Sequence, residues 1–119
     1  MQHYTITKYG EANFCLQYED KELLDLINDY INKKIEAKED YFTYFTLCKS
    51  ILNRADRENR LIDKDPETYY ASPSLAPSEY TRISRLLWKL ILGGKIFVDF
   101  SNNAYIAHYE NDTILGINS

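Results

Sequence analysis

Four side chains in the last third of the chain share a spacing that suits contact with phosphate groups. On a helix that turns about 100° per residue, Ser78, Arg82, Arg85 and Lys89 fall on one side. No acidic residue occurs between Arg82 and Lys95. Arginine and lysine on one helix face can bind the phosphates of a nucleic acid, and serine can hydrogen-bond to a base edge. The alternative is a solvated face of an ordinary surface helix, since cations at this spacing also occur by chance.

Residues that would support other chemistry are scattered along the chain. The two histidines, His3 and His108, lie at opposite ends of the sequence, and the four glycines form no phosphate-binding loop. No cluster of histidine, cysteine and acidic residues has the spacing of a metal site. Cys15 and Cys48 lie in separate apolar runs, which favours buried, reduced thiols. The sequence therefore predicts that the protein is not an enzyme and has no metal and no cofactor.

The charge balance argues against a generally basic nucleic-acid-binding protein. The 119 residues include 14 basic and 18 acidic side chains, for a net charge of −4. The whole excess of acid lies in the first 40 residues, so the later part of the chain is neutral and residues 82–95 are locally basic. The longest apolar runs are too short to span a bilayer, and the N-terminus does not resemble a signal peptide. We therefore expect a cytoplasmic protein that has no contact with a membrane.

The first half of the chain predicts strands followed by two helices. Residues 1–18 favour a β-hairpin, or else one strand followed by irregular chain. Two helices are expected within residues 20–56, one capped by Asp20 and the next capped by Asp40. Leucine, isoleucine and tyrosine recur at three- and four-residue steps and predict the buried face of the first of these helices: Leu23, Leu24, Leu26, Ile27, Tyr30, Ile31 and Ile35.

The second half predicts a long connection, one helix and a second hairpin. Residues 57–77 contain all three prolines and are expected to form a loop, with a short helical turn near Pro66 as the alternative. A third helix spans residues 78–93 and ends at two glycines. Its core face is predicted to be Tyr80, Ile83, Leu86, Leu87 and Leu90. Residues 95–110 then favour a β-hairpin with Asn102 and Asn103 at its tip, and Ile114–Ile117 could add a last strand.

Two aromatic or apolar pairs are candidates for a partner interface. Trp88 and Leu92 fall on the third helix beside Arg85, away from its core face. The favoured interpretation is that the N-terminal hairpin covers them, and the alternative is an exposed patch that meets a partner or a second copy of the chain. Tyr69 and Tyr70 lie in the long connection and could anchor a partner. The alternative for them is compositional, because 11 tyrosines accompany a single valine.

The run from Leu75 to Lys89, followed by Gly94, Lys95 and Ile96, resembles the recognition helix and following strand of winged helix-turn-helix regulators. The shared features are a serine- and threonine-rich helix start, an arginine in mid-helix, a leucine-rich inner face and a glycine before the wing. The resemblance covers residues 75–109. One feature departs from the family, because about twenty residues separate the second and third helices where a helix-turn-helix has three or four.

The resemblance implies an α+β fold of winged-helix type in a single domain, with an N-terminal β-hairpin, three main helices and a C-terminal β-hairpin, the wing. It also implies that the third helix enters the major groove of double-stranded DNA while the wing touches the flanking backbone. The DNA-binding residues would be the serine, threonine and cations of the helix, the lysine after it and the wing tip: Ser78, Thr81, Arg82, Arg85, Lys89, Lys95, Asn102 and Asn103.

We therefore expect a small DNA-binding protein that regulates transcription, of a size that would suit a mobile element. So few cations predict modest affinity for each monomer, which favours a homodimer. The alternative function is a protein-binding adaptor or inhibitor that uses the acidic helix Glu22–Glu39 and the tyrosine-rich surface to meet its partner.

Overall fold

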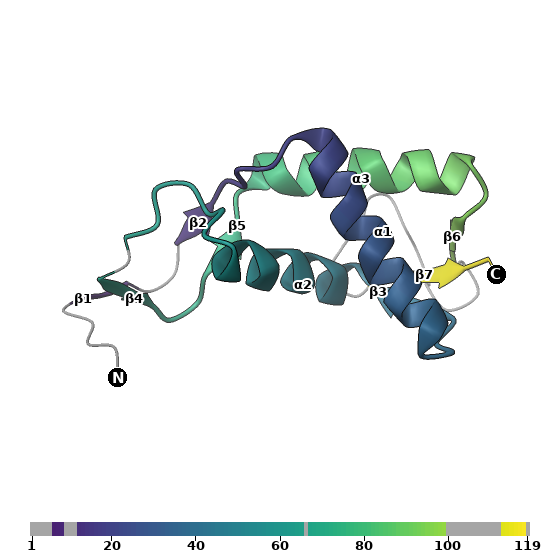
Figure 1. Ribbon diagram of the computed structural model, residues 1–119, viewed down its shortest axis with the longest axis horizontal. Coiled ribbons are helices and arrows are strands. Elements are labelled where there is room, and N and C mark those ends of the chain that lie inside the picture. The colour runs from purple at the N-terminus through teal and green to yellow at the C-terminus, as the bar shows by residue number, and fades with distance from the viewer. Residues whose placement is uncertain (1–5, 9–11, 66, 100–112, 119) are drawn as a thin grey trace.

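The computed structural model of this protein describes residues 6–8, 12–65, 67–99 and 113–118. Within these residues the protein is an α+β structure with three helices and three small sheets (Figure 1). The elements follow one another in the order β1 (Ile6–Lys8), β2 (Asn13–Phe14), α1 (Asp20–Glu36), β3 (Tyr41–Thr43), α2 (Tyr44–Arg57), β4 (Thr68–Tyr70), β5 (Ser74–Leu75), α3 (Pro77–Leu92), β6 (Ile96–Val98) and β7 (Ile114–Ile117).

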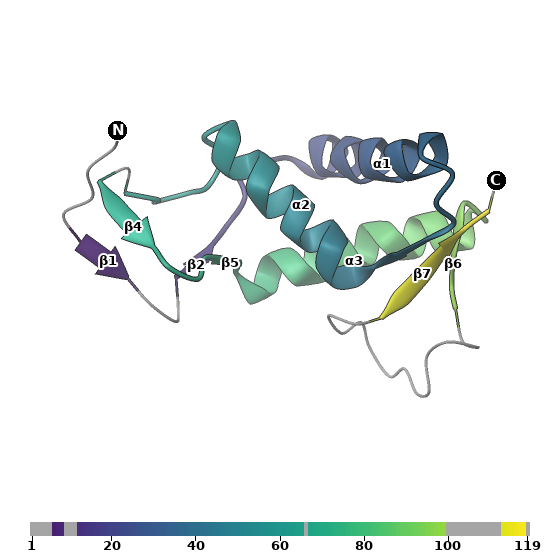
Figure 2. The same ribbon diagram turned by 90° about the horizontal axis from the view of Figure 1, so that it is seen from below.

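The helices lie in the middle of the molecule, between two groups of strands (Figures 1 and 2). β1 and β4 lie at one end of the long axis, which measures 47 Å, and the sheet of β3, β6 and β7 lies at the other end. None of the described helices has the length and hydropathy that crossing a bilayer requires.

The first two predicted helices are present, but their N-terminal caps differ from the prediction. α1 begins after Glu19, whose backbone N–H donates to the Glu22 carboxylate at 3.1 Å. The prediction of one helix from Asp40 was wrong, because the β-prone residues Tyr41–Thr43 form strand β3 before α2 begins. The Thr43 hydroxyl then caps α2 by accepting a hydrogen bond from the backbone N–H of Thr46 at 3.1 Å.

The two described strands of the predicted N-terminal hairpin, β1 and β2, do not pair with each other. β1 pairs in parallel with β4, and β2 pairs in parallel with β5, so each N-terminal strand has its partner about sixty residues along the chain. After β2 the chain forms a separate antiparallel bridge between Leu16 and Leu61, where the backbone N–H of Gln17 donates to Arg60 at 2.8 Å and that of Ile62 donates to Cys15 at 2.9 Å. The segment predicted as the loop 57–77 is therefore largely organised by the N-terminal segment. Its described part contains the strands β4 and β5 and, between the end of α2 at Arg57 and the start of α3 at Pro77, no further helix.

Strands from three parts of the chain form an antiparallel sheet in the order β3–β7–β6. The first strand of the predicted wing, 95–110, is present as β6, and it pairs with β7, the segment considered as an additional last strand. The predicted second strand of the wing and its tip, Asn102 and Asn103, lie outside the described residues.

One face of this antiparallel sheet is buried, and the other carries two exposed aromatic side chains. Tyr41 and Phe97 flank Gly116 in the register of the sheet. The Phe97 ring covers Gly116 so closely that a Cβ atom at position 116 would overlap the ring. Glycine is therefore required here by the space that the ring occupies.

The hydrophobic core lies between the helices and is closed by the strands. The predicted inner faces are largely confirmed by the fully or nearly fully buried side chains of α1 and α3: Leu23, Leu26, Ile27, Ile31, Ile83, Leu86 and Leu87. Ile35, which was expected on the core face, is exposed near the end of α1. Cys48 is buried as expected, but Cys15 is exposed, because the buried side chains of its strand segment are those of Phe14 and Leu16.

Candidate nucleic-acid interface

Helix α3 is positioned by distinct start and stop signals. Pro77 occupies the first turn, where its missing N–H costs no hydrogen bond. At the other end the backbone N–H of Lys95 donates to Leu90 and that of Gly94 donates to Ile91, both at 3.0 Å. This pattern closes the helix in a Schellman motif, and Gly94 supplies the positive φ of +79° that the motif needs. The helix thus matches the predicted range 78–93 within one residue at each end.

The neighbours of α3 leave one side of the helix facing outward. α2 lies along one flank, where the Tyr44 hydroxyl donates to the backbone carbonyl of Tyr80 at 3.0 Å and lies 3.1 Å from the Ser84 hydroxyl. Burial raises the pKa of Tyr44, so this hydroxyl stays protonated. Helix α1 also packs against α3. The exposed face of α3 consists of the residues that point away from both α1 and α2: Pro77, Ser78, Thr81, Arg85, Trp88, Lys89 and Leu92.

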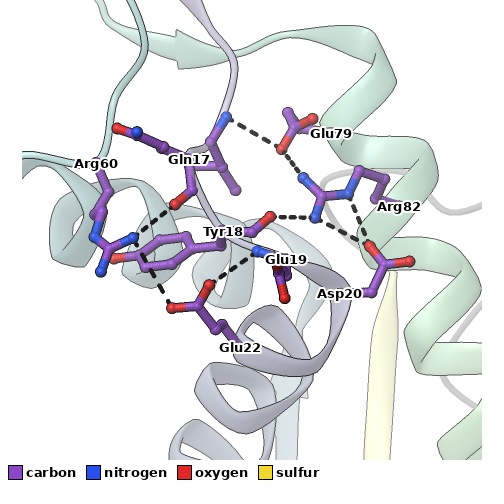
Figure 3. Close-up of polar contacts among 9 residues, drawn as sticks. Gln17, Tyr18, Glu19, Asp20, Glu22, Arg60, Glu79 and Arg82 are labelled. Atoms are coloured by element: carbon purple, nitrogen blue, oxygen red, sulfur yellow. Dashed lines mark hydrogen bonds and ion pairs between the residues drawn. The ribbon is translucent and has the colours of Figure 1, made fainter.

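Arg82 lies at the α1 side of the helix, and its charge is balanced by two carboxylates (Figure 3). Its guanidinium donates to Glu79 at 2.7 Å, to Asp20 at 3.0 Å and to the backbone carbonyl of Tyr18 at 2.6 Å. Glu79 is only 4% exposed and also accepts a hydrogen bond from the backbone N–H of Leu16 at 3.2 Å. We call Arg82, Glu79 and Asp20 the arginine clamp, because together they hold the N-terminal segment against α3. The expectation that Arg82 faces DNA is therefore not supported by its position.

Lys95 also points toward the protein. Its side chain is half-buried, and its ammonium group donates to the Asn28 side chain of α1 at 2.9 Å. The predicted role of Lys95 as a phosphate ligand does not agree with this placement, because the lysine turns toward α1 after the helix ends.

Arg85 and Lys89 remain on the exposed face of α3 as predicted. Within the described residues, neither side chain forms an ion pair or hydrogen bond. Ser78 is exposed beside them, and the Thr81 hydroxyl lies 3.3 Å from the Pro77 carbonyl at the start of the helix. Of the six predicted DNA-binding residues that lie in the described part of the chain, the structure thus brings together four: Ser78, Thr81, Arg85 and Lys89.

Trp88 and Leu92 lie on the same exposed face of α3. Trp88 is 50% exposed and Leu92 is 84% exposed, so the favoured expectation that the N-terminal segment buries them was wrong. The described part of that segment pairs with β4 and β5 instead, and it contacts the first half of α3 through Glu79 and Arg82. The two side chains form an exposed apolar pair, which was the alternative interpretation.

The other predicted interface pair lies elsewhere in the molecule. Tyr69 and Tyr70 belong to β4, at the opposite end of the long axis from the C-terminal half of α3 (Figures 1 and 2). Tyr69 is exposed, whereas Tyr70 is half-buried. The ring of Tyr70 packs against that of Phe14, with 4.9 Å between the ring centroids. The predicted partner residues therefore do not form a single surface.

A second basic surface, on α2, was missed by the sequence analysis. Lys49, Asn53 and Arg57 follow one another at four-residue steps on the outward side of this helix, beside a shallow cavity of about 300 Å³. Among the described residues, Phe45, Thr46 and Ser50 also line this cavity, and no acidic side chain does. The i, i+4 spacing is visible in the sequence and could have indicated this surface.

Among the described residues, no group of histidine, cysteine and acidic side chains is arranged to hold a metal ion. Comparison with protein-family models, with curated proteins and with solved structures gave no match for this chain. The geometry of α3 and its neighbours is therefore the basis for a functional proposal.

Proposed function

We propose that this chain is a regulatory protein of winged-helix type that binds double-stranded DNA with the exposed face of α3. The order of elements supports the winged-helix resemblance. Helices α1, α2 and α3 are followed by two antiparallel strands, and β3 completes the sheet from its position between α1 and α2. A helix with an outward face thus directly precedes the paired strands β6 and β7.

The observation that carries the proposal is the pair of cations on the exposed face that form no ion pair with any described residue. Arg85 and Lys89 are surrounded on that face by hydroxyl and apolar groups and by no carboxylate. An α-helix fits the major groove of B-DNA, where arginine and lysine bind guanine or phosphate oxygens, and serine and threonine bind either bases or phosphates. Ser78 and Thr81 lie at the start of the helix, where they can supply such contacts.

The acidic side chains of α1 favour this orientation over one that places α1 against DNA. α1 exposes several carboxylates, and phosphates would be repelled from it. With only Arg85 and Lys89 available on α3, the affinity of one monomer should be low, and two copies on neighbouring half-sites would strengthen binding.

The alternative of an adaptor or inhibitor that binds partners through the acidic helix is less well supported. Among the described residues, three acidic side chains of α1 already form ion pairs: Asp20 with Arg82 at 3.0 Å, Asp29 with Arg54 at 3.3 Å and Glu22 with Arg60 at 3.9 Å. The acidic surface left for a partner is correspondingly reduced.

The proposal can be tested by the salt dependence of binding to a random-sequence duplex of about 20 base pairs, or two helical turns. We expect Arg85→Gln and Lys89→Gln each to reduce the slope of log K against log salt concentration by about 0.9, the value for one lost phosphate contact. Lys33→Gln is the matched control, since this exposed lysine of α1 has no ion pair among the described residues. Equal slopes for all four proteins would contradict DNA binding by this face.

A further inference from the structure

The exposed face of α3 carries its apolar and cationic side chains in alternation. Trp88 and Leu92 lie four residues apart and are therefore neighbours on the helix surface. Arg85 precedes Trp88 by three residues, and Lys89 precedes Leu92 by three residues, so each apolar side chain adjoins a cation. Any molecule that covers this apolar pair also comes within reach of two positive charges.

We propose that Trp88 and Leu92 contact the methyl groups of thymine in the major groove, so that the protein prefers A·T-rich duplex DNA. This inference rests on the proposed function and adds a sequence preference to it. The major groove of A·T-rich DNA presents apolar methyl groups at the base edges and anionic phosphates at the rim, and so complements both kinds of side chain. A cationic face without apolar groups would bind phosphates but gain nothing from the methyl groups.

A second copy of the chain is a poorer occupant of the same face. A two-fold symmetric contact would place this face against itself. Arg85 and Lys89 of the two copies would then approach one another, and the exposed face has no carboxylate to balance them. Two apolar side chains also fall well short of the roughly 800 Å² that each partner buries in a standard interface.

The test compares a duplex of alternating A·T pairs with the same duplex in which uracil replaces thymine, which removes only the C5 methyl group. We expect the thymine duplex to bind more tightly by about fourfold for each methyl group that the protein covers. A G·C duplex with 5-methylcytosine should likewise bind more tightly than its unmethylated form, because the methyl group occupies the same groove position.

The variant Leu92→Ala should reduce the preference for thymine over uracil, and the strong exposure of Leu92 means that this change leaves the fold intact. Ile35→Ala, which truncates an exposed apolar side chain of α1, is the matched control and should leave the preference unchanged.

Two results would overturn the inference while leaving the proposed function in place. The first is equal binding of the thymine and uracil duplexes, with both weakened by Arg85→Gln. The second is a dimer in analytical ultracentrifugation that Leu92→Glu dissociates, which would assign the apolar pair to a second copy. Failure of the proposed function looks different, since then neither duplex binds in a way that depends on Arg85.

Discussion

Replacing Arg82 with alanine separates a role in the fold from a role in DNA binding. Arg82 was expected to face DNA, yet its guanidinium is held by Glu79, Asp20 and the backbone carbonyl of Tyr18. The substitution Arg82→Ala removes all of these contacts at once. It leaves the Glu79 carboxylate buried with one remaining hydrogen bond among those described, from the backbone N–H of Leu16.

The size of the effect follows from the burial of Glu79. Removing one partner of a buried ion pair destabilises proteins by about 3–5 kcal/mol, because the other charge stays desolvated. The Arg82 side chain is 23% exposed and that of Asp20 is largely exposed. We therefore expect the loss in free energy of unfolding to lie near the lower limit, at about 3 kcal/mol. For a domain of this size, that change lowers Tm by about 12 °C.

Urea unfolding followed by circular dichroism at 222 nm measures this change directly. Arg85→Ala is the matched control, since it removes an arginine three residues further along the same helix that has no described partner. The control should change the free energy of unfolding by less than about 0.5 kcal/mol. Arg82→Lys should fall between wild type and Arg82→Ala, because lysine keeps the charge but not the planar set of donors.

DNA binding by the same variants completes the comparison. Folded Arg82→Ala should bind duplex DNA with the wild-type salt slope, because in the wild-type protein the Arg82 guanidinium points into the protein and contacts no phosphate. A structural role of the arginine clamp is refuted if Arg82→Ala is as stable as Arg85→Ala, or if Arg82→Ala loses a phosphate contact while its stability is unchanged.

Three further predictions concern groups outside α3. A thiol reagent at pH 8 should modify the exposed Cys15 quickly and Cys48 only on unfolding, because burial raises the pKa of Cys48 to about 12; equal rates would contradict this. Gly116→Ala should destabilise the protein by about 1–3 kcal/mol in urea unfolding, since the new methyl group displaces the Phe97 ring; the loss should be smaller in a Phe97→Ala background. Burial raises the pKa of Tyr18 to about 12 from 10.0, so its neutral form stabilises the fold below pH 10 and this contribution is lost as pH rises from 10 to 12. Tyr18→Phe should flatten that part of the curve of stability against pH, and an unchanged curve would contradict the assignment.

Local patterns in the sequence predict the helices of this protein well. The core face of α3 follows from leucine and isoleucine at helical spacing, and its end follows from Gly93 and Gly94. Strand β3 was missed because its three residues continue the aromatic run into α2, and only the cap at Thr43 separates the two elements. The boundary between β3 and α2 is marked by one capping hydrogen bond, and the spacing of hydrophobic residues does not indicate it.

The pairing of the N-terminal strands was beyond the reach of local patterns. β2 has its partner β5 about sixty residues away, and nothing in either short strand specifies that register. This error carried over to the candidate site, because the N-terminal segment was expected to cover Trp88 and Leu92. The N-terminal strands β1 and β2 pair with β4 and β5 instead, and Trp88 and Leu92 are exposed.

The balance of charge at Arg82 could be predicted only in part. Glu79 precedes Arg82 by three residues on the same helix, and that spacing indicates an ion pair. Asp20 and the Tyr18 carbonyl come from more than sixty residues earlier in the chain, and only the packing of α1 against α3 brings them into place. Arg85 and Lys89 are exposed and have no such neighbours in the described part of the chain.

Fluorescence of Trp88 tests DNA binding by the exposed face most directly, because Trp88 is the single tryptophan of the chain and lies between Arg85 and Lys89. Acrylamide, an uncharged quencher, should reach the half-exposed indole in the unbound protein. We expect saturating duplex DNA to protect it, with a clear fall in the quenching constant that high salt reverses. Binding of duplex DNA with the quenching constant of Trp88 unchanged would contradict the proposal that this face of α3 contacts DNA.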